Sequence, residues 1–275
     1  MAKKLVQPLK WHGGKHYLAK QILALMPPHV HYVEPYFGGG SVLLEKDPHN
    51  VSEVVNDING NLVNFWRVLR APEHFAKFVR VIQATPFSQE LWEESGAVLE
   101  TEAPDEIDVD RAIQFFIRCR QSRAGKFDAF ATLSKRRTRR GMNEQASAWL
   151  SAVEGLPEAA QRMQRVAIYR EDAVKVIQKE DSTSTLFYLD PPYLHETRVT
   201  TQDYAHEMNY EDHQRLLQTI KQVEGSVILS GYPSELYQTE LQDWRRHQIE
   251  IDNKASSKSQ KPIKTECLWM NFQGE

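Results

Sequence analysis

The sequence predicts an α/β fold in which a doubly wound, mostly parallel β-sheet carries an inserted, mainly helical lobe. Short apolar runs rich in β-branched and aromatic residues alternate with segments whose apolar residues recur at helical spacing, and this alternation is typical of a parallel sheet. Between residues 59 and 164 the strand signals disappear and only helical spacing remains. We therefore expect a sheet domain made of residues 1–58 and 165–275, and a helical lobe at 59–164.

Most of the expected strands are short runs rich in Val, Ile, Leu, Phe and Tyr. In chain order, the expected strands are residues 30–36, 52–56, 166–169, 185–189, 226–230, 246–251 and 267–271. A polar segment at 253–261 joins the last two. We expect these two strands to form an antiparallel hairpin at one edge of the sheet.

The expected helices follow from apolar residues spaced three and four positions apart. Outside the lobe, they are residues 40–46, 172–179, 210–223 and 234–241, and a helix at 58–69 leads into the lobe. Within the lobe, the spacing of Phe65, Trp66 and Leu69 is helical, and similar spacing recurs around Phe78 and Phe116.

The composition is that of a soluble globular protein, with 275 residues of which 41% are apolar and 26% charged. The first residues lack the apolar stretch of a signal peptide, and no apolar run reaches membrane-spanning length. The two cysteines, Cys119 and Cys267, lie far apart without a Cys-x-x-Cys partner, so we interpret both as packed thiols rather than as a disulfide or metal ligands. A cytoplasmic protein that binds no membrane is therefore expected.

Charge is strongly segregated along the chain, although the net charge is only −3. Residues 90–110 contain nine acidic and no basic residues, which favours a solvated helix face and loop. Residues 111–141 contain ten basic residues and one acidic residue, a local balance of +9. The local balance, rather than the net charge, therefore decides what this part of the chain can bind.

The tetrapeptide Asp190-Pro191-Pro192-Tyr193 directly follows the apolar run 185–189. Proline has no N–H for a strand ladder and fixes its own φ, so the strand is expected to stop here. The strand end then presents a carboxylate, the Pro191 carbonyl and an aromatic ring in one small space. Two such oxygens can accept the two hydrogens of a base's amino group while the Tyr193 ring stacks on the base. An ordinary strand-terminating turn would also explain the prolines.

A second motif, Phe37-Gly38-Gly39-Gly40, follows the first expected strand. Glycines permit a tight turn and let the backbone approach a ligand closely. Asp57 stands at the end of the second expected strand, where an acidic side chain is placed to accept hydrogen bonds from ribose hydroxyls. The glycines alone would fit a plain turn, but together with Asp57 they favour a nucleoside-bearing cofactor.

With a third motif at residues 8–15, Pro-Leu-Lys-Trp-His-Gly-Gly-Lys, the chain resembles the Dam-like adenine-specific DNA methyltransferases. That family carries a Lys-Trp-x-Gly-Gly-Lys opening, a Phe-x-Gly-x-Gly loop and an Asp-Pro-Pro-Tyr motif in this order. The resemblance runs over almost the whole chain. It implies a class I, Rossmann-like methyltransferase fold, S-adenosylmethionine as the methyl donor, and a target adenine that is flipped out of double-stranded DNA.

The resemblance also implies roles for individual residues. The implied cofactor-binding residues are Trp11, Lys15, Glu34, Phe37, Gly38, Gly40, Asp57, Asp172 and Asp190. The implied catalytic residues are Asp190, Pro191, Pro192 and Tyr193. Asp172 is also placed to be the N-terminal cap of the following helix, and this alternative stays open.

The basic segments 118–126 and 134–141 predict a DNA-binding surface in the lobe, because clustered guanidinium groups neutralise phosphates. The expected DNA-binding residues are Arg120, Arg123, Lys126, Lys135, Arg136, Arg137, Arg139 and Arg140. A solvated basic loop is the alternative.

Two other functions remain open from the sequence. An amino methyltransferase acting on RNA, cytosine or a protein glutamine amide would use a similar motif, although the aspartate at position 190 favours adenine. A non-catalytic DNA-binding protein is disfavoured by the intact motifs. His29 and His31 share one face of an expected strand, but no third ligand accompanies them, so we expect no metal.

Overall fold

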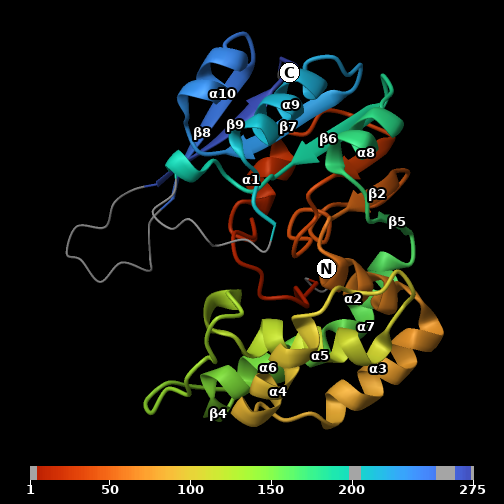
Figure 1. Ribbon diagram of the computed structural model, residues 1–275, viewed down its shortest axis with the longest axis vertical. Coiled ribbons are helices and arrows are strands. Elements are labelled where there is room, and N and C mark those ends of the chain that lie inside the picture. The colour runs from red at the N-terminus through yellow and green to blue at the C-terminus, as the bar shows by residue number, and fades with distance from the viewer. Residues whose placement is uncertain (1–4, 198–205, 252–263, 274–275) are drawn as a thin grey trace. The chain divides into compact units, whose positions relative to one another are not determined.

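The computed structural model describes residues 5–197, 206–251 and 264–273, and the chain divides into two compact units (Figure 1). The first consists of Met1–Ala24, Phe37–Asp47 and Asp57–Arg170. The second consists of Leu25–Tyr36, Pro48–Asn56 and Glu171–Glu275. The first unit therefore contains the N-terminal segment and the glycine loop together with the helices of residues 57–170. The division at 59–164 was drawn from the loss of strand signals and stays a prediction.

The sheet has seven strands in the order β5-β2-β1-β6-β7-β9-β8. Their bounds are β1 His31–Glu34, β2 Ser52–Asn56, β5 Val166–Tyr169, β6 Thr185–Leu189, β7 Ser226–Gly231, β8 Arg245–Ile251 and β9 Lys264–Met270. Strand β1 is parallel to β2 and to β6, and β6 is parallel to β7. Strand β9 is antiparallel to β7 and to β8. The predicted mostly parallel sheet with an antiparallel edge hairpin is confirmed; the polar joining segment lies outside the described residues.

The central strands are buried and mostly apolar. All five residues of β6 are buried, and so are five of the six residues of β7. A continuous apolar run of this kind is typical of parallel strands covered on both faces. The helices of the second unit are α8 (Ala173–Lys179), α9 (Tyr210–Ile220) and α10 (Glu235–Glu240). Their bounds are close to the expected ones.

The helices of the first unit occur where helical spacing predicted a helical region, except α1, which was not predicted. They are α1 Ala19–Ala24, α2 Gly60–Arg70, α3 Pro72–Ala84, α4 Gln89–Leu99, α5 Val109–Gln121, α6 Glu144–Glu154 and α7 Leu156–Met163. Helix α5 packs against α2, α3 and α4 through an aromatic core in which Phe65 and Phe116 stack with ring centroids 5.8 Å apart. Among the described residues, no helix is long and apolar enough to cross a bilayer.

Two expectations about local structure were wrong. Residues 40–46 form turns rather than a helix, because the Leu44-to-Gly40 and Lys46-to-Val42 backbone bonds are not part of a continuous ladder. The lobe also contains a small antiparallel hairpin, β3 (Thr138–Arg139) and β4 (Met142–Asn143), in the region where no strand was expected. The basic segment is thus displayed on a hairpin rather than on an irregular loop.

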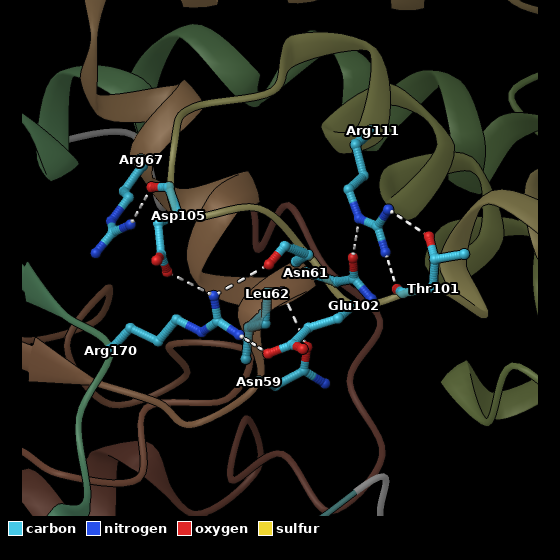
Figure 2. Close-up of polar contacts among 10 residues, drawn as sticks. Asn59, Asn61, Leu62, Arg67, Thr101, Glu102, Asp105, Arg111 and Arg170 are labelled. Atoms are coloured by element: carbon cyan, nitrogen blue, oxygen red, sulfur yellow. Dashed lines mark hydrogen bonds and ion pairs between the residues drawn. The ribbon is translucent and has the colours of Figure 1, made fainter.

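The acidic segment is anchored by arginines (Figure 2). Arg170 pairs with Asp105 Oδ1 at 3.1 Å and with Glu102 Oε1 at 3.3 Å. Arg67 donates to the Asp105 carbonyl at 3.2 Å, and Arg111 donates to the Thr101 hydroxyl at 3.1 Å. The side chains of Glu102 and Asp105 are nevertheless 89% and 97% exposed, as expected for a solvated acidic segment.

Candidate active site

The Asp-Pro-Pro-Tyr motif begins where β6 leaves the sheet. The last paired residue of β6 with β7 is Leu189, opposite Leu229, and Asp190 comes directly after it. In the strand order, β1 lies between β2 and β6, so the chain order reverses direction between β1 and β6. Ligands of open α/β sheets bind outside the carboxyl ends of the strands at such a point. Asp190 and Glu34, the last residue of β1, both belong to this edge.

The structure brings Asp190 and Tyr193 together. The Tyr193 hydroxyl lies 3.4 Å from Asp190 Oδ1, and the Tyr193 ring contacts Tyr232 edge-to-face with centroids 4.5 Å apart. Tyr193 is only 7% exposed, and Pro191 is also buried. The motif therefore forms a packed corner of the second unit rather than an exposed loop.

A residue that the sequence analysis did not select, Glu266, completes this corner. Its carboxylate accepts hydrogen bonds from the hydroxyls of Tyr193 and Ser230, the latter at 2.6 Å. Burial raises the pKa of Tyr188 strongly, and the carboxylates of Asp190 and Glu266 raise it further, so both acidic groups act on the same buried phenol. The one signal in the sequence is a glutamate next to the apolar run 267–270.

Glu34 and Asp172, both predicted cofactor ligands, also lie in the second unit. Glu34 is 2% exposed and accepts a 2.6 Å hydrogen bond from the Tyr32 hydroxyl, whose pKa is raised by burial and by the Glu34 charge. Asp172 is the N-cap of α8, where it accepts from the Lys175 N–H at 3.2 Å, and it pairs with Arg215. The capping alternative for Asp172 is therefore confirmed, and its cofactor contact stays a prediction.

The first unit holds the other predicted cofactor residues around the glycine loop. Gly38 and Gly40 have φ values of 51° and 71°, a left-handed conformation that favours glycine. The Gly38 N–H donates to Asp57 Oδ2 at 2.9 Å, and the Gly38 carbonyl accepts from Trp66 at 3.1 Å. Asp57 and the glycine loop are therefore joined within the first unit, and their common cofactor role stays a prediction.

Trp11 packs directly on this loop. A Cβ at Gly39 would lie 2.6 Å from the Trp11 Cβ, and one at Gly38 would lie 2.9 Å from the indole nitrogen, so neither position has room for a side chain. Phe115 and Phe127 hold the other side of the indole, with centroids 6.1 Å and 6.0 Å away. The first unit therefore brings Trp11, Gly38 and Asp57 together.

Lys15 and Phe37 flank this arrangement. Lys15 is 7% exposed and its ammonium donates to the Gly13 carbonyl at 3.2 Å, which folds the opening motif back on itself. Phe37 is buried against Trp66, with ring centroids 5.1 Å apart. Phe37 thus supports the loop from within the core.

Most of the predicted DNA-binding side chains are on the surface of the first unit. The β3–β4 hairpin turns at Arg140 and Gly141, whose φ values of 55° and 74° are those of a two-residue type I′ turn. Arg137 pairs with Glu144 at 3.0 Å and Arg140 with Glu154 at 2.8 Å. Three exposed basic side chains form no ion pair within the described residues: Lys135, Arg136 and Arg139.

The basic side chains of residues 118–126 differ in their exposure to solvent. Arg123 is exposed and lies 3.9 Å from Asp128, and Lys126 is half-buried. Arg120 differs from both, because its Nη2 donates to the Ala148 carbonyl at 2.9 Å and its Nε is buried. Burial also lowers the pKa of Arg120. Its guanidinium thus has a partner within the first unit, and its predicted contact with DNA stays a prediction.

The histidines and cysteines have structural surroundings. His29 Nδ1 lies 2.7 Å from the Pro27 carbonyl and His31 Nε2 lies 3.1 Å from Glu180. Both Cys119 and Cys267 are buried free thiols, as predicted. In the part of the chain that the structure describes, no group of three or more His, Cys, Asp or Glu side chains is placed to hold a metal.

Comparison with known proteins agrees with these motifs. A model of the D12 class N6 adenine-specific DNA methyltransferase family matches residues 11–255. The Type II methyltransferase M1.LlaDCHI of Lactococcus lactis subsp. cremoris is 28% identical over 275 residues, covering 96% of this chain and 94% of that protein. The DNA N-6-adenine-methyltransferase of Escherichia phage P1 is 27% identical over 248 residues, 83% of this chain and 30% of that protein.

A shorter stretch matches a third relative. The DNA adenine methylase of Vibrio cholerae serotype O1 is 40% identical over 62 residues, or 22% of each chain. The family match is much longer and includes the glycine loop and the Asp-Pro-Pro-Tyr motif. The resemblance drawn from the motifs is confirmed: the chain belongs to the D12 class N6 adenine-specific DNA methyltransferase family.

Proposed function

We propose how this adenine-specific DNA methyltransferase carries out its reaction: it takes a methyl group from S-adenosylmethionine and transfers it to the exocyclic amino group of an adenine flipped out of double-stranded DNA. The observation that carries the proposal is the position of Asp190 and Tyr193 directly after β6, at the carboxyl edge of the sheet. We further propose that the fold is the class I methyltransferase fold and that residues 59–164 act as its target-recognition lobe.

Asp190 and the Pro191 carbonyl hold the adenine amino group in this proposal. Each oxygen accepts one amino hydrogen, which draws the nitrogen lone pair out of conjugation with the ring. Pro192 has no N–H and a fixed φ, so it keeps the backbone at this corner in one conformation. Positioning and charge complementarity supply the catalysis, and no covalent bond to the protein is formed.

Tyr193 is proposed to stack on the flipped base, a contact worth roughly 1–3 kcal/mol in stacking platforms generally. Because Tyr193 is only 7% exposed, neighbouring groups must move aside as the base enters. Flipping itself is needed because the amino group of a stacked base is out of reach of any donor held by the protein.

The cofactor is proposed to bind at residues that fit its chemistry. When bound, S-adenosylmethionine supplies an electrophilic methyl group on a sulfonium sulfur. Trp11 offers apolar surface, Phe37 supports the loop from within the core, and Gly38 and Gly40 let the backbone come close. Asp57 accepts two backbone N–H groups, from Gly38 and Asn59, which orient the carboxylate that is proposed to bind the ribose hydroxyls.

Three more charged residues complete the proposed cofactor site. Lys15 is proposed to face the methionine carboxylate or to orient the catalytic loop, and Glu34 to act at the carboxyl end of β1. Asp172 is proposed to lie near the adenine of the cofactor, in addition to its capping of α8.

DNA is proposed to contact the hairpin and the adjoining basic cluster. The proposed residues are Arg120, Arg123, Lys126, Lys135, Arg136, Arg137, Arg139 and Arg140. The exposed guanidinium groups on β3 and its turn support this surface, since they can neutralise phosphates with little rearrangement. A cytoplasmic location follows from the need to reach DNA.

The test is methyl transfer from labelled cofactor to DNA, RNA and protein substrates offered separately. We expect label in DNA alone, at the N6 position of adenine. Asp190→Ala is expected to bind DNA as the wild-type protein does and to transfer no methyl group. Label found only in RNA or protein, or an active Asp190→Ala protein, would overturn the proposal.

A further inference from the structure

Glu266 is a buried acidic residue at the same sheet edge as the catalytic motif. Strand β9 is antiparallel to β7, with Cys267 opposite Gly231, the last residue of β7. The first residues of β9 therefore lie beside the carboxyl end of β7, which is itself next to β6. Glu266 is 2% exposed. A carboxylate in such a place is costly unless hydrogen bonds compensate its burial.

Two hydroxyl groups supply those hydrogen bonds. Tyr193 and Ser230 both donate to Glu266 Oε1, Ser230 at 2.6 Å, and the contact with Tyr193 is the shorter of the two. Hydrogen bonds to an ionised acceptor are about twice as strong as those between neutral groups. The contact joins Tyr193, at the end of β6, to a strand 73 residues later in the chain.

The same tyrosine hydroxyl also lies 3.4 Å from Asp190 Oδ1. A phenol has a single hydrogen to donate, so a hydrogen bond to Glu266 is one that Asp190 does not receive. Glu266 thereby acts on the reaction through Tyr193, without reaching the substrate itself.

We propose that Glu266 is a positioning residue for methyl transfer: by accepting the Tyr193 hydroxyl hydrogen, it fixes the Tyr193 ring beside Asp190. The inference rests on the proposed roles of Asp190 and Tyr193. Strand β9 thus has a function beyond closing the sheet, because it carries the acceptor that sets the geometry of the catalytic corner.

The first test compares Glu266→Gln with Glu266→Leu. Glutamine keeps a carbonyl oxygen for Tyr193 and is expected to retain kcat within about 3-fold, whereas leucine is expected to lower kcat by about 10- to 100-fold, the cost of a misplaced catalytic group. The dissociation constant for S-adenosylmethionine, measured by titration, is expected to be unchanged in both. Glu250→Gln, an exposed glutamate on the neighbouring strand β8, is the matched control with wild-type activity.

A double-mutant cycle gives the second test. Tyr193→Phe keeps the ring but removes the hydrogen bond, and it is expected to lower kcat about as much as Glu266→Leu. In the Tyr193→Phe background, Glu266→Leu is expected to add less than about a 2-fold loss, since both substitutions remove one interaction. Losses that multiply as independent effects would overturn the inference, as would a fully active Glu266→Leu protein.

Two further outcomes distinguish a failure of this inference from a folding defect and from a failure of the proposed roles of the motif. If Glu266→Leu does not fold, as judged by thermal unfolding, Tyr193→Phe alone decides, and wild-type kcat in that variant would overturn the inference. If Asp190→Ala is inactive while Glu266→Leu is fully active, only this inference is overturned. An active Asp190→Ala protein would instead overturn the proposed roles of the motif.

Discussion

Asp57 accepts a hydrogen bond from the Gly38 N–H at 2.9 Å, so this carboxylate anchors the glycine loop across 19 residues of sequence. The same carboxylate accepts from the Asn59 N–H at 2.9 Å with its other oxygen. Both oxygens of the predicted ribose ligand are therefore oriented by backbone groups of the same unit. This ordering is what a pre-formed hydrogen-bond acceptor for a nucleoside requires.

Asp57→Ala is expected to weaken S-adenosylmethionine binding by roughly 10- to 100-fold, because a hydrogen bond to a charged group is worth about 1.5–3 kcal/mol and the loop loses its anchor as well. The measurement is a calorimetric or fluorescence titration of the cofactor. Asp181→Ala is the matched control, since Asp181 also accepts two backbone N–H groups, from Glu224 and Gly225. The control is expected to lower stability but to leave the cofactor dissociation constant unchanged; equal cofactor affinity in both variants would contradict the role of Asp57.

Gly125→Ala is expected to destabilise the protein far more than Gly141→Ala. Both glycines have positive φ, 70° and 74°, which costs an alanine about 1–2 kcal/mol. A Cβ at Gly125 would lie 1.8 Å from the Lys10 carbonyl oxygen, whereas nothing lies within 4 Å of one at Gly141. The difference in the free energy of unfolding, measured with urea, is expected to exceed about 2 kcal/mol. Equal losses would show that Lys10 does not pack on this turn.

The sequence predicted the sheet well because its central strands are largely apolar and buried. Residues 52–56, 166–169 and 185–189 have the bounds that were expected, and the antiparallel edge pair was recognised from its polar joining segment. Strands that are buried on both faces need apolar side chains at nearly every position, so a short continuous apolar run indicates such a strand.

Local backbone geometry and long-range polar contacts were harder to predict. The helix expected at 40–46 assumed that the glycines begin a helix, but the positive φ values of Gly38 and Gly40 turn the chain instead. The β3–β4 hairpin has no apolar alternation, and its one signal is Arg140-Gly141 as a two-residue turn. The role of Glu266 could not be predicted from the sequence, because its partner Tyr193 is distant in sequence and no local pattern connects them.

Arg139→Ala is expected to weaken DNA binding and to reduce its dependence on salt. Arg139 is exposed on the hairpin and has no recorded ion pair within the described residues, so it is available to a phosphate. One lost phosphate contact lowers the slope of log K against log salt concentration by about 0.9. The measurement is fluorescence anisotropy with a labelled duplex at several salt concentrations. Arg80→Ala, an exposed arginine on α3, is the control, and an equal change of slope in both variants would contradict a specific DNA surface.

The buried thiol of Cys119 is expected to make the protein less stable at alkaline pH. Burial, the largest influence, raises the pKa of Cys119 from 9.0 to about 12. A raised pKa means that the folded protein keeps a proton which the unfolded chain loses, so this stabilisation is complete below pH 9 and falls as the pH rises towards 12. The slope is about 1.4 kcal/mol per pH unit in this range. Cys119→Ala, which still packs a small apolar side chain, is expected to show a pH dependence of urea unfolding that is shallower by this amount between pH 9 and 11, while parallel curves for the two proteins would contradict the burial of the thiol.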